Sequence, residues 1–136
     1  MKILKVNHLG IVPKEPQQTH RFLDEILLLD PIGSEAVEDQ QVFVDFFAAG
    51  GTRLEILTPT SEQSPVAQYL AKRGSGIQHV ALEVDDIKAW LSHLKAKGIE
   101  LIDSEPRRGA HNTSIAFIHP RATGGVLIEL VQEGQK

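Results

Sequence analysis

The order of apolar and polar positions predicts that the chain repeats one series of elements twice. In the first half, a nearly continuous apolar run over Ile3–Val12 predicts a buried strand, and the helical spacing of apolar residues over 19–29 predicts a helix. Residues 30–40 are typical of a loop or an edge strand. Residues 41–48 and 52–58, joined by a Gly-Gly turn, predict a hairpin of two strands.

The second half follows the same order. Residues 77–84 predict a strand, and Asp85-Asp86 offers a cap for a helix over 87–97 that ends at Gly98. Helical spacing predicts which side chains of that helix pack inward: Ile87, Trp90, Leu91 and Leu94. A loop is expected over 105–113, and three more strands are expected over 99–104, 114–119 and 126–132.

A short helix is predicted between the halves, with Ser64 as its cap and Pro65 at its first position. The length suits a single domain over 1–136, with a first module over about 1–60, a linking helix over about 61–75 and a second module over about 76–136. We therefore expect an α+β fold in which two tandem βαβββ modules form a curled mixed sheet around a metal site.

Composition narrows the functional classes. The chain has no cysteine, so histidine and carboxylate must supply any metal ligands. A net charge of −4 and few aromatic residues give no reason to expect a nucleic-acid partner. No apolar run reaches the ~18 residues that a membrane span needs, and the first residues do not form a signal peptide. A soluble, cytoplasmic protein without a membrane partner is expected.

The repeat extends to polar residues inside the predicted strands. The segment NHLGIV aligns with QHVALE, histidine on histidine, and LEIL aligns with IELV, glutamate on glutamate. Because side chains alternate across a strand, Glu55 and Glu129 lie opposite the apolar residues that would contact the helices. The repeat then places His8 and His79 on the same side.

Two imidazoles and two carboxylates suit a divalent cation such as Zn²⁺, Mn²⁺, Co²⁺, Ni²⁺ or Fe²⁺. Four protein ligands leave two positions of an octahedral shell open, as a catalytic metal requires. Without a cation, each buried carboxylate would cost several kcal/mol or would become neutral. The alternative interpretation is two buried neutral acids and two core histidines.

At this point the residues resemble a known family. Paired βαβββ modules with His…Glu…His…Glu resemble the vicinal oxygen chelate superfamily, which has the glyoxalase-like fold. Within it the closest resemblance is to the methylmalonyl-CoA epimerases. The resemblance is carried over almost the whole chain by NHLGIV, by LEILTPTSEQSPVAQYLAKRGSGIQHVALEVDDI, by KGIELIDSEPRRGAH and by FIHPRATGGVLIEL.

The resemblance implies metal-dependent epimerisation of (2R)- and (2S)-methylmalonyl-CoA through a stabilised enolate, with Co²⁺ as the favoured metal. It assigns His8, Glu55, His79 and Glu129 as ligands and gives Glu129 acid/base work. Some relatives have glutamine where this chain has Glu55, and some have a second catalytic glutamate where it has Val44. Glu55 is therefore the candidate for the second acid/base.

Two other functions share this pattern. Glyoxalase I acts on a glutathione hemithioacetal with the same four ligand types, and some modules of this fold bind ligands without catalysis. An extradiol dioxygenase would usually want three protein ligands on iron. The blocks around Ser64 and Pro120 favour the epimerase.

The acyl-CoA partner and the assembly are also expectations. Basic side chains that could meet the phosphates of a coenzyme A tail or line the mouth of the site are Lys72, Arg73, Arg107, Arg108 and His111. His119, before Pro120, is expected to have a structural or substrate-edge role. A homodimer is expected from the resemblance alone.

Overall fold

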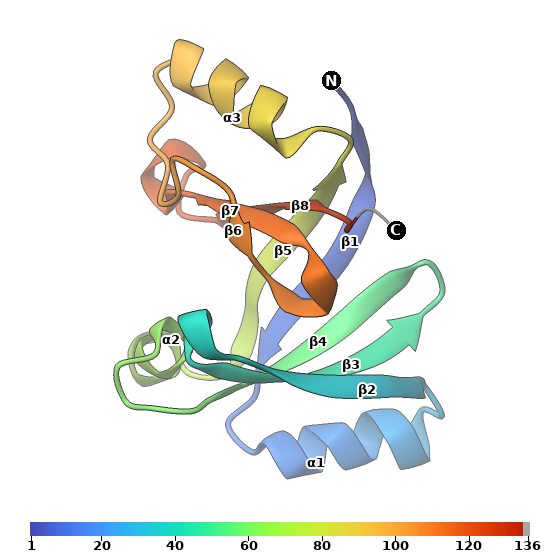
Figure 1. Cartoon of the computed structure of the whole chain (residues 1–136). Coiled ribbons are helices and arrows are strands. Elements are labelled where there is room, and N and C mark those ends of the chain that lie inside the picture. Colours follow the sequence, from blue (N-terminus) through green and yellow to red (C-terminus); the bar gives the residue numbers. More distant parts are fainter. Residues whose placement is uncertain (135–136) are drawn as a thin grey trace. The chain divides into compact units, whose positions relative to one another are not determined.

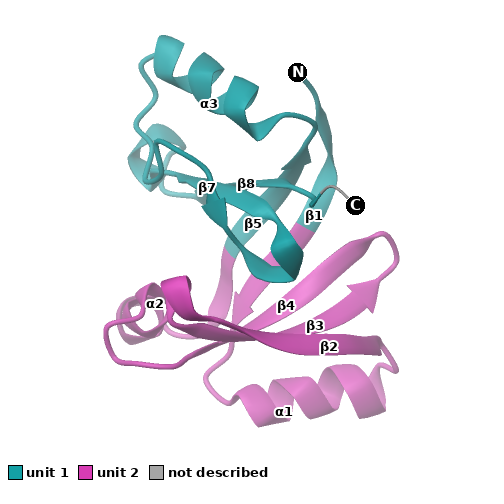
Figure 2. Ribbon diagram, in the orientation of Figure 1, with its two compact units in different colours: residues 1–7, 79–136 teal, residues 8–78 magenta. Residues whose placement is uncertain are grey.

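The computed structural model describes residues 1–134, which divide into two compact units (Figure 2). Unit 2 comprises His8–Gln78, and unit 1 comprises Met1–Asn7 together with the residues from His79 onward. The division falls within the two equivalent first strands, β1 (Ile3–Val12) and β5 (Gly76–Val84).

Unit 2 has the predicted order of strand, helix and three strands. After β1 come the helix α1 (Pro16–Arg21), which continues as a π-helical turn η1 (Phe22–Ile26), and then β2 (Asp30–Val37), the 3₁₀ turn η2 (Glu38–Gln40), β3 (Val42–Ala49) and β4 (Thr52–Pro59). The strands lie in the order β2-β3-β4-β1. The β1/β4 pair is parallel, whereas β2/β3 and β3/β4 are antiparallel.

The helix of unit 2 covers one face of this sheet (Figure 1). Leu23 packs there with Phe47 and Ile56, which are fully buried. These contacts confirm that the Leu54/Ile56 face of β4 lies under the helix and that Glu55 belongs to the opposite face. The edge strand expected within residues 30–40 is β2, at the end of the strand order.

The predicted bounds of the first helix, 19–29, are wrong. The helix begins three residues earlier because Pro16 occupies its first turn, where the fixed φ of proline suits a helix and no N–H is required. It ends at Ile26, and Leu28 then adopts a left-handed conformation with φ of 58°. Of the apolar residues within η1, only Leu23 is buried.

The linking helix α2 (Pro65–Arg73) forms as predicted. The Ser64 hydroxyl accepts a hydrogen bond from the Val66 N–H at 3.2 Å, and Pro65 follows at the first helical position. Ser64 and Val66 are buried, and Gly74 ends the helix with φ of 77°. A left-handed residue at this position favours glycine, which pays no steric penalty there.

Unit 1 repeats the topology. After β5 come α3 (Ile87–Ala96), β6 (Arg107–Arg108), the 3₁₀ turn η3 (Ala110–Asn112), β7 (Ser114–Ile118), the 3₁₀ turn η4 (Pro120–Ala122) and β8 (Leu127–Gln132). The strands lie in the order β5-β8-β7-β6. Again the first and last strands, β5 and β8, are parallel, and the β7 pairings are antiparallel. This shared order confirms the predicted α+β class with two βαβββ modules.

The helix α3 packs on one face of the unit 1 sheet, as predicted (Figure 1). Ile87 and Leu91 are each 2% exposed and contact Ala116 and Leu130, with Trp90 and Leu94 partly buried around them. The predicted cap also forms, because the Asp86 carboxylate accepts a hydrogen bond from the Ala89 N–H at 3.1 Å.

The predicted strand over 99–104 is wrong. Only an isolated bridge joins Leu101 to Ile118. The Asp103 carboxylate accepts a hydrogen bond from the Phe117 N–H at 2.8 Å, and the Ile102 and Asp103 N–H groups both donate to the Phe117 carbonyl. A side chain thus replaces part of the backbone ladder. The third strand of this module is instead the two-residue β6, inside the predicted loop.

Within residues 1–134, no helix is long and apolar enough to cross a membrane.

Substitution of the α3 cap tests how the second module is stabilised. Asp86→Ala removes the acceptor for the Ala89 N–H and should lower the free energy of unfolding by about 1 kcal/mol, measured by urea denaturation. Lys88→Ala is the matched control, since Lys88 is exposed on the same first turn. Equal stability of the two variants would contradict the capping role.

Candidate functional site

In unit 2, a histidine and a glutamate meet on the face of the sheet that the helix leaves uncovered. His8 Nδ1 lies 3.1 Å from Glu55 Oε2, and both residues are 5% exposed. Their strands are parallel neighbours, with His8 opposite Arg53 and Gly10 opposite Glu55. Alternation on β1 and β4 therefore directs both side chains to the same face.

The surroundings of Glu55 restrict its carboxylate. Gly10 on one side has no side chain, and Phe46 on the other is 1% exposed. Arg53 Nε donates to the same oxygen, Oε2, at 3.4 Å, and its guanidinium lies 5.9 Å from the centre of the Phe46 ring. Glu55 thus has a cationic neighbour as well as the imidazole.

Unit 1 contains the equivalent pair. His79 Nε2 lies 3.0 Å from Glu129 Oε1, and the two residues are 6% and 4% exposed. Ala81 is opposite Glu129 on β5, and Phe117 is opposite it on β7. The His79 ring meets the Phe117 ring edge-on, with ring centres 5.6 Å apart. The pair lies away from α3, on the face that carries Ala81, Phe117 and Val131.

The donor chemistry of each pair fits a divalent cation. Imidazole nitrogen and carboxylate oxygen bind such ions at about 2.0–2.2 Å, so two ligands at right angles would be about 3 Å apart. The separations of 3.0 and 3.1 Å match this spacing. His8, His79 and Glu129 each provide a buried donor atom of the required type.

The walls around the two glutamates were not predicted from the sequence. Phe46 and Phe117 are in register with Glu55 and Glu129, and each ring has an arginine guanidinium within 6 Å: Arg53 in unit 2 and Arg107 in unit 1. Phe46 lies nine residues before Glu55, whereas Phe117 lies twelve residues before Glu129, so an alignment of the two halves backward from the glutamates does not place the two phenylalanines at the same position.

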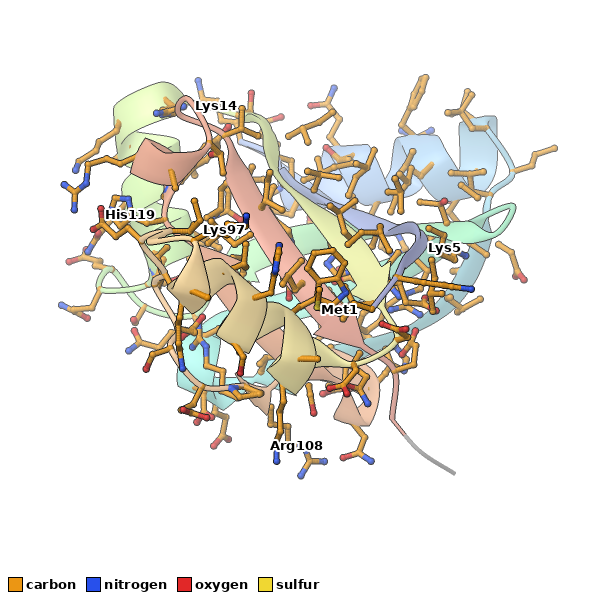
Figure 3. All side chains as sticks on the ribbon, turned by 90° about the horizontal axis from the view of Figure 1, so that it is seen from above. Met1, Lys5, Lys14, Lys97, Arg108 and His119 are labelled. Atoms are coloured by element: carbon orange, nitrogen blue, oxygen red, sulfur yellow. The ribbon has the colours of Figure 1, made fainter. Side chains whose placement is uncertain are left out.

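The basic residues proposed for coenzyme A lie in different environments. Lys72 and Arg73 are exposed at the end of α2. Arg107 is partly buried, and its Nε forms an ion pair with Asp103 Oδ1 at 3.2 Å without the alignment of a hydrogen bond. Arg108 is exposed at the periphery of the molecule (Figure 3), and His111 is exposed in a left-handed conformation.

Comparison with protein families identifies the chain. Residues 7–117 match the model of the glyoxalase/bleomycin resistance protein/dioxygenase superfamily. The chain belongs to this superfamily. The match covers most of both βαβββ modules and confirms the resemblance drawn from the His…Glu…His…Glu repeat.

The similar proteins of this superfamily include several epimerases of methylmalonyl-CoA. The chain is 41% identical to the ethylmalonyl-CoA/methylmalonyl-CoA epimerase of Cereibacter sphaeroides, over 94% of this chain and 97% of that protein. The solved methylmalonyl-CoA epimerase of Mycobacterium tuberculosis is 32% identical and matches with a TM-score of 0.93, over 98% and 90% of the two chains. A Streptomyces coelicolor methylmalonyl-CoA epimerase variant in complex with 2-nitronate-propionyl-CoA is 31% identical and matches with a TM-score of 0.92, over 98% and 96%.

The His119 side chain stabilises the turn that precedes β8. Its Nδ1 accepts a hydrogen bond from the Arg121 N–H at 3.1 Å and caps η4. The Arg121 guanidinium donates to both carboxylate oxygens of Glu100, at 2.6 and 3.1 Å. These hydrogen bonds hold the pKa of Glu100 below its ordinary value of 4.5.

Removal of the guanidinium tests this assignment. Arg121→Gln should raise the pKa of Glu100 toward 4.5, measured by NMR titration of its side-chain carboxyl. Because the folded pKa is the lower one, the pair stabilises the fold above pH 4.5, and this contribution disappears as the pH falls through the folded pKa. Lys95→Gln, which removes a contact with Glu105 instead, should leave the Glu100 titration unchanged; an equal shift would contradict the assignment.

Proposed function

We propose that the chain is an isomerase that interconverts (2R)- and (2S)-methylmalonyl-CoA by removal and return of the C2 proton. The observation that carries the proposal is the 41% identity with the ethylmalonyl-CoA/methylmalonyl-CoA epimerase of Cereibacter sphaeroides, over 97% of that protein. The solved epimerase with a bound propionyl-CoA nitronate lends further support, since a nitronate has the planar, anionic form of a deprotonated C2.

The reaction makes demands that the two His–Glu pairs can meet. The C2 proton lies between a thioester and a carboxylate and is weakly acidic. Its removal makes C2 planar and moves negative charge onto the thioester oxygen, so catalysis needs a base at C2 and stabilisation of that charge. Buried carboxylates next to apolar walls provide a base from which water is largely excluded.

We assign His8, Glu55, His79 and Glu129 as the ligands of one divalent cation. Such a cation would supply electrostatic stabilisation of charge on the thioester oxygen. The assignment is supported by the donor types, by their burial and by the spacing within each pair. Co²⁺ is the proposed metal from the resemblance, and Zn²⁺, Mn²⁺ and Ni²⁺ suit the same donors.

Glu129 is our candidate for the carboxylate that moves the C2 proton on one face. His79 next to it orients the carboxylate, and Phe117 and Ala81 enclose it on both sides along the sheet. Glu55 is the candidate, chosen from the sequence, for the group that transfers a proton on the opposite face of C2.

The acyl-CoA substrate and the assembly complete the proposal. The candidates for contacts with coenzyme A are Lys72, Arg73, Arg107, Arg108 and His111. All of them except Arg107 are exposed, so their side chains can contact phosphate groups of a ligand without first leaving a buried position. A homodimer is proposed from the resemblance.

A second function is favoured by one observation. Glu55, where some relatives have glutamine, gives a ligand set of the same type as that of glyoxalase I, and it is buried against His8. The alternative is therefore a lyase that acts on a glutathione hemithioacetal. A ligand-binding module without catalysis would have no need of two buried His–Glu pairs.

Proton exchange separates these functions. In deuterated water with Co²⁺, the protein should incorporate deuterium at C2 of methylmalonyl-CoA and convert either epimer into the mixture, as followed by mass spectrometry and chiral chromatography. The hemithioacetal of glutathione and methylglyoxal should not be turned over. The reverse outcome, turnover of the hemithioacetal with no exchange at C2, would establish the lyase function and exclude the epimerase function.

Metal binding gives an independent prediction. His79→Ala removes one proposed ligand and should weaken Co²⁺ binding by more than the roughly 10–100-fold that loss of an outer partner costs, measured by titration of the visible Co²⁺ absorption. His93→Ala is the matched control, because His93 lies on α3, on the other side of the unit 1 sheet. Undiminished Co²⁺ affinity in His79→Ala would exclude His79 as a ligand.

A further inference from the structure

The proposed substrate carries its own carboxylate on C2, and this group sets a requirement for the site. When Glu129 removes the C2 proton, the acyl carboxylate is bonded to the same carbon. Two negative charges this close repel each other, the more so where water is largely excluded. A cation at this place would bind the acyl carboxylate and offset the repulsion. The need for it rests on the proposed epimerase function, and unit 1, which contains Glu129, has a residue that can meet it.

Arg107 lies on the face of the unit 1 sheet that carries Glu129. In the register of the strands, Arg107 of β6 is opposite Ile115 of β7, and Ile115 is opposite Val131 of β8. Directly opposed residues share a face, and Ile115 and Val131 belong to the apolar cluster on the Glu129 side. Arg107 therefore occupies the register position next to the row that contains Glu129 and Phe117.

The Arg107 side chain extends toward that row. Its guanidinium carbon lies 5.7 Å from the centre of the Phe117 ring. Phe117 is opposite Glu129 in the sheet, and its ring meets the His79 ring edge-on, with ring centres 5.6 Å apart. The same phenylalanine thus adjoins both the guanidinium and the His79–Glu129 pair, and all four residues belong to unit 1.

A fixed carboxylate holds Arg107 by one edge. Asp103 Oδ2 accepts a hydrogen bond from the Phe117 N–H at 2.8 Å, which anchors the carboxylate to β7. Its other oxygen, Oδ1, lies 3.2 Å from Arg107 Nε. Within residues 1–134, no other polar contact engages the Arg107 side chain. Because a guanidinium has five N–H donors, the four on its terminal nitrogens remain for a ligand.

The other arginines of unit 1 are less suited to a ligand beside Glu129. Arg107 is partly buried, with a side chain that is 35% exposed and a buried Nε. Arg108 is opposite Ser114 on the other face of the sheet and is exposed. The Arg121 guanidinium already donates to both carboxylate oxygens of Glu100. A guanidinium that is partly withdrawn from water can bind a carboxylate through two parallel hydrogen bonds, and Arg107 meets this condition.

The position of Arg107 favours the acyl carboxylate over the phosphates of coenzyme A. The phosphates lie at the far end of the pantetheine arm, many bonds from the thioester. The acyl carboxylate is bonded to C2 itself and must lie near Glu129 when that residue moves the C2 proton. A cation that adjoins Phe117, the neighbour of Glu129, is therefore placed for the carboxylate.

We propose that Arg107 binds the free carboxylate of the methylmalonyl group and makes the site selective for acyl-CoA thioesters with an ionised carboxyl group on C2. The terminal nitrogens of Arg107 donate to the two oxygens of that carboxylate. Asp103 is a positioning residue that orients the guanidinium through Nε. The positive charge of Arg107 also offsets the repulsion between the acyl carboxylate and Glu129.

Two matched ligands separate the carboxylate from the rest of the substrate. Isobutyryl-CoA is close in size to methylmalonyl-CoA but has a methyl group in place of the carboxylate. The dissociation constants of both are measured by isothermal titration calorimetry in the presence of Co²⁺, with methylmalonyl-CoA at its epimer equilibrium. Arg107→Gln should weaken binding of methylmalonyl-CoA by about 10- to 100-fold, as expected for loss of a charge-assisted contact. The affinity for isobutyryl-CoA should not change.

Control variants make this result specific. Arg108→Gln is the same substitution at the next residue, on the other face of the sheet, and it should leave the ratio of the two affinities unchanged because both ligands share the coenzyme A part. Arg107→Lys keeps the charge without the planar fork and should retain part of the preference for methylmalonyl-CoA. Circular dichroism melting of each variant checks the fold.

Each alternative has its own outcome. Equal weakening of both ligands in Arg107→Gln would assign the residue to coenzyme A or to the fold and would overturn the proposal. Unchanged affinity for methylmalonyl-CoA in that variant would also overturn it, although the epimerase function would stand if the wild-type protein inverts the substrate. If the wild-type protein does not invert methylmalonyl-CoA, the epimerase function fails, and the role of Arg107 fails with it.

Discussion

The burial of a carboxylate beside an imidazole, once in each sheet, is the constraint on which the rest of the structure depends. Each mixed sheet has one face closed by a helix and an apolar cluster. The opposite face must then accommodate Glu55 or Glu129, each about 95% buried, next to His8 or His79. A buried charge without a partner costs several kcal/mol, so these faces need compensating positive charge. The divalent cation proposed above would supply that charge, and it would account for four polar residues in strands that could otherwise be wholly apolar.

The duplication of the βαβββ module gives the two glutamates similar settings but different neighbours. Both have a small residue on one side in the sheet and a phenylalanine on the other. At the next register position, unit 2 carries Glu35 and unit 1 carries Arg107.

Much of this could be predicted from the sequence, because periodicity and alternation decide which face each side chain occupies. The helix face of α3, the Ser64 and Asp86 caps and the orientation of Glu55 and Glu129 all follow from local patterns. Two features do not follow from local patterns. The start of α1 at Pro16 depends on a choice between two prolines. The loss of the strand over 99–104 depends on the hydrogen bond of Asp103 with Phe117, on a strand distant in the sequence. The sequence pattern also does not give the cross-strand register, which is why Phe46 and Phe117 were not identified as neighbours of the two glutamates.

The central claim, that both His–Glu pairs bind a single cation, is tested most directly by X-ray absorption spectroscopy of the cobalt-loaded protein together with metal analysis. The account predicts one Co²⁺ per chain, with two imidazole nitrogens and carboxylate oxygens at about 2.0–2.2 Å. A shell with fewer than two imidazoles, or binding of two ions per chain with one imidazole each, would contradict it.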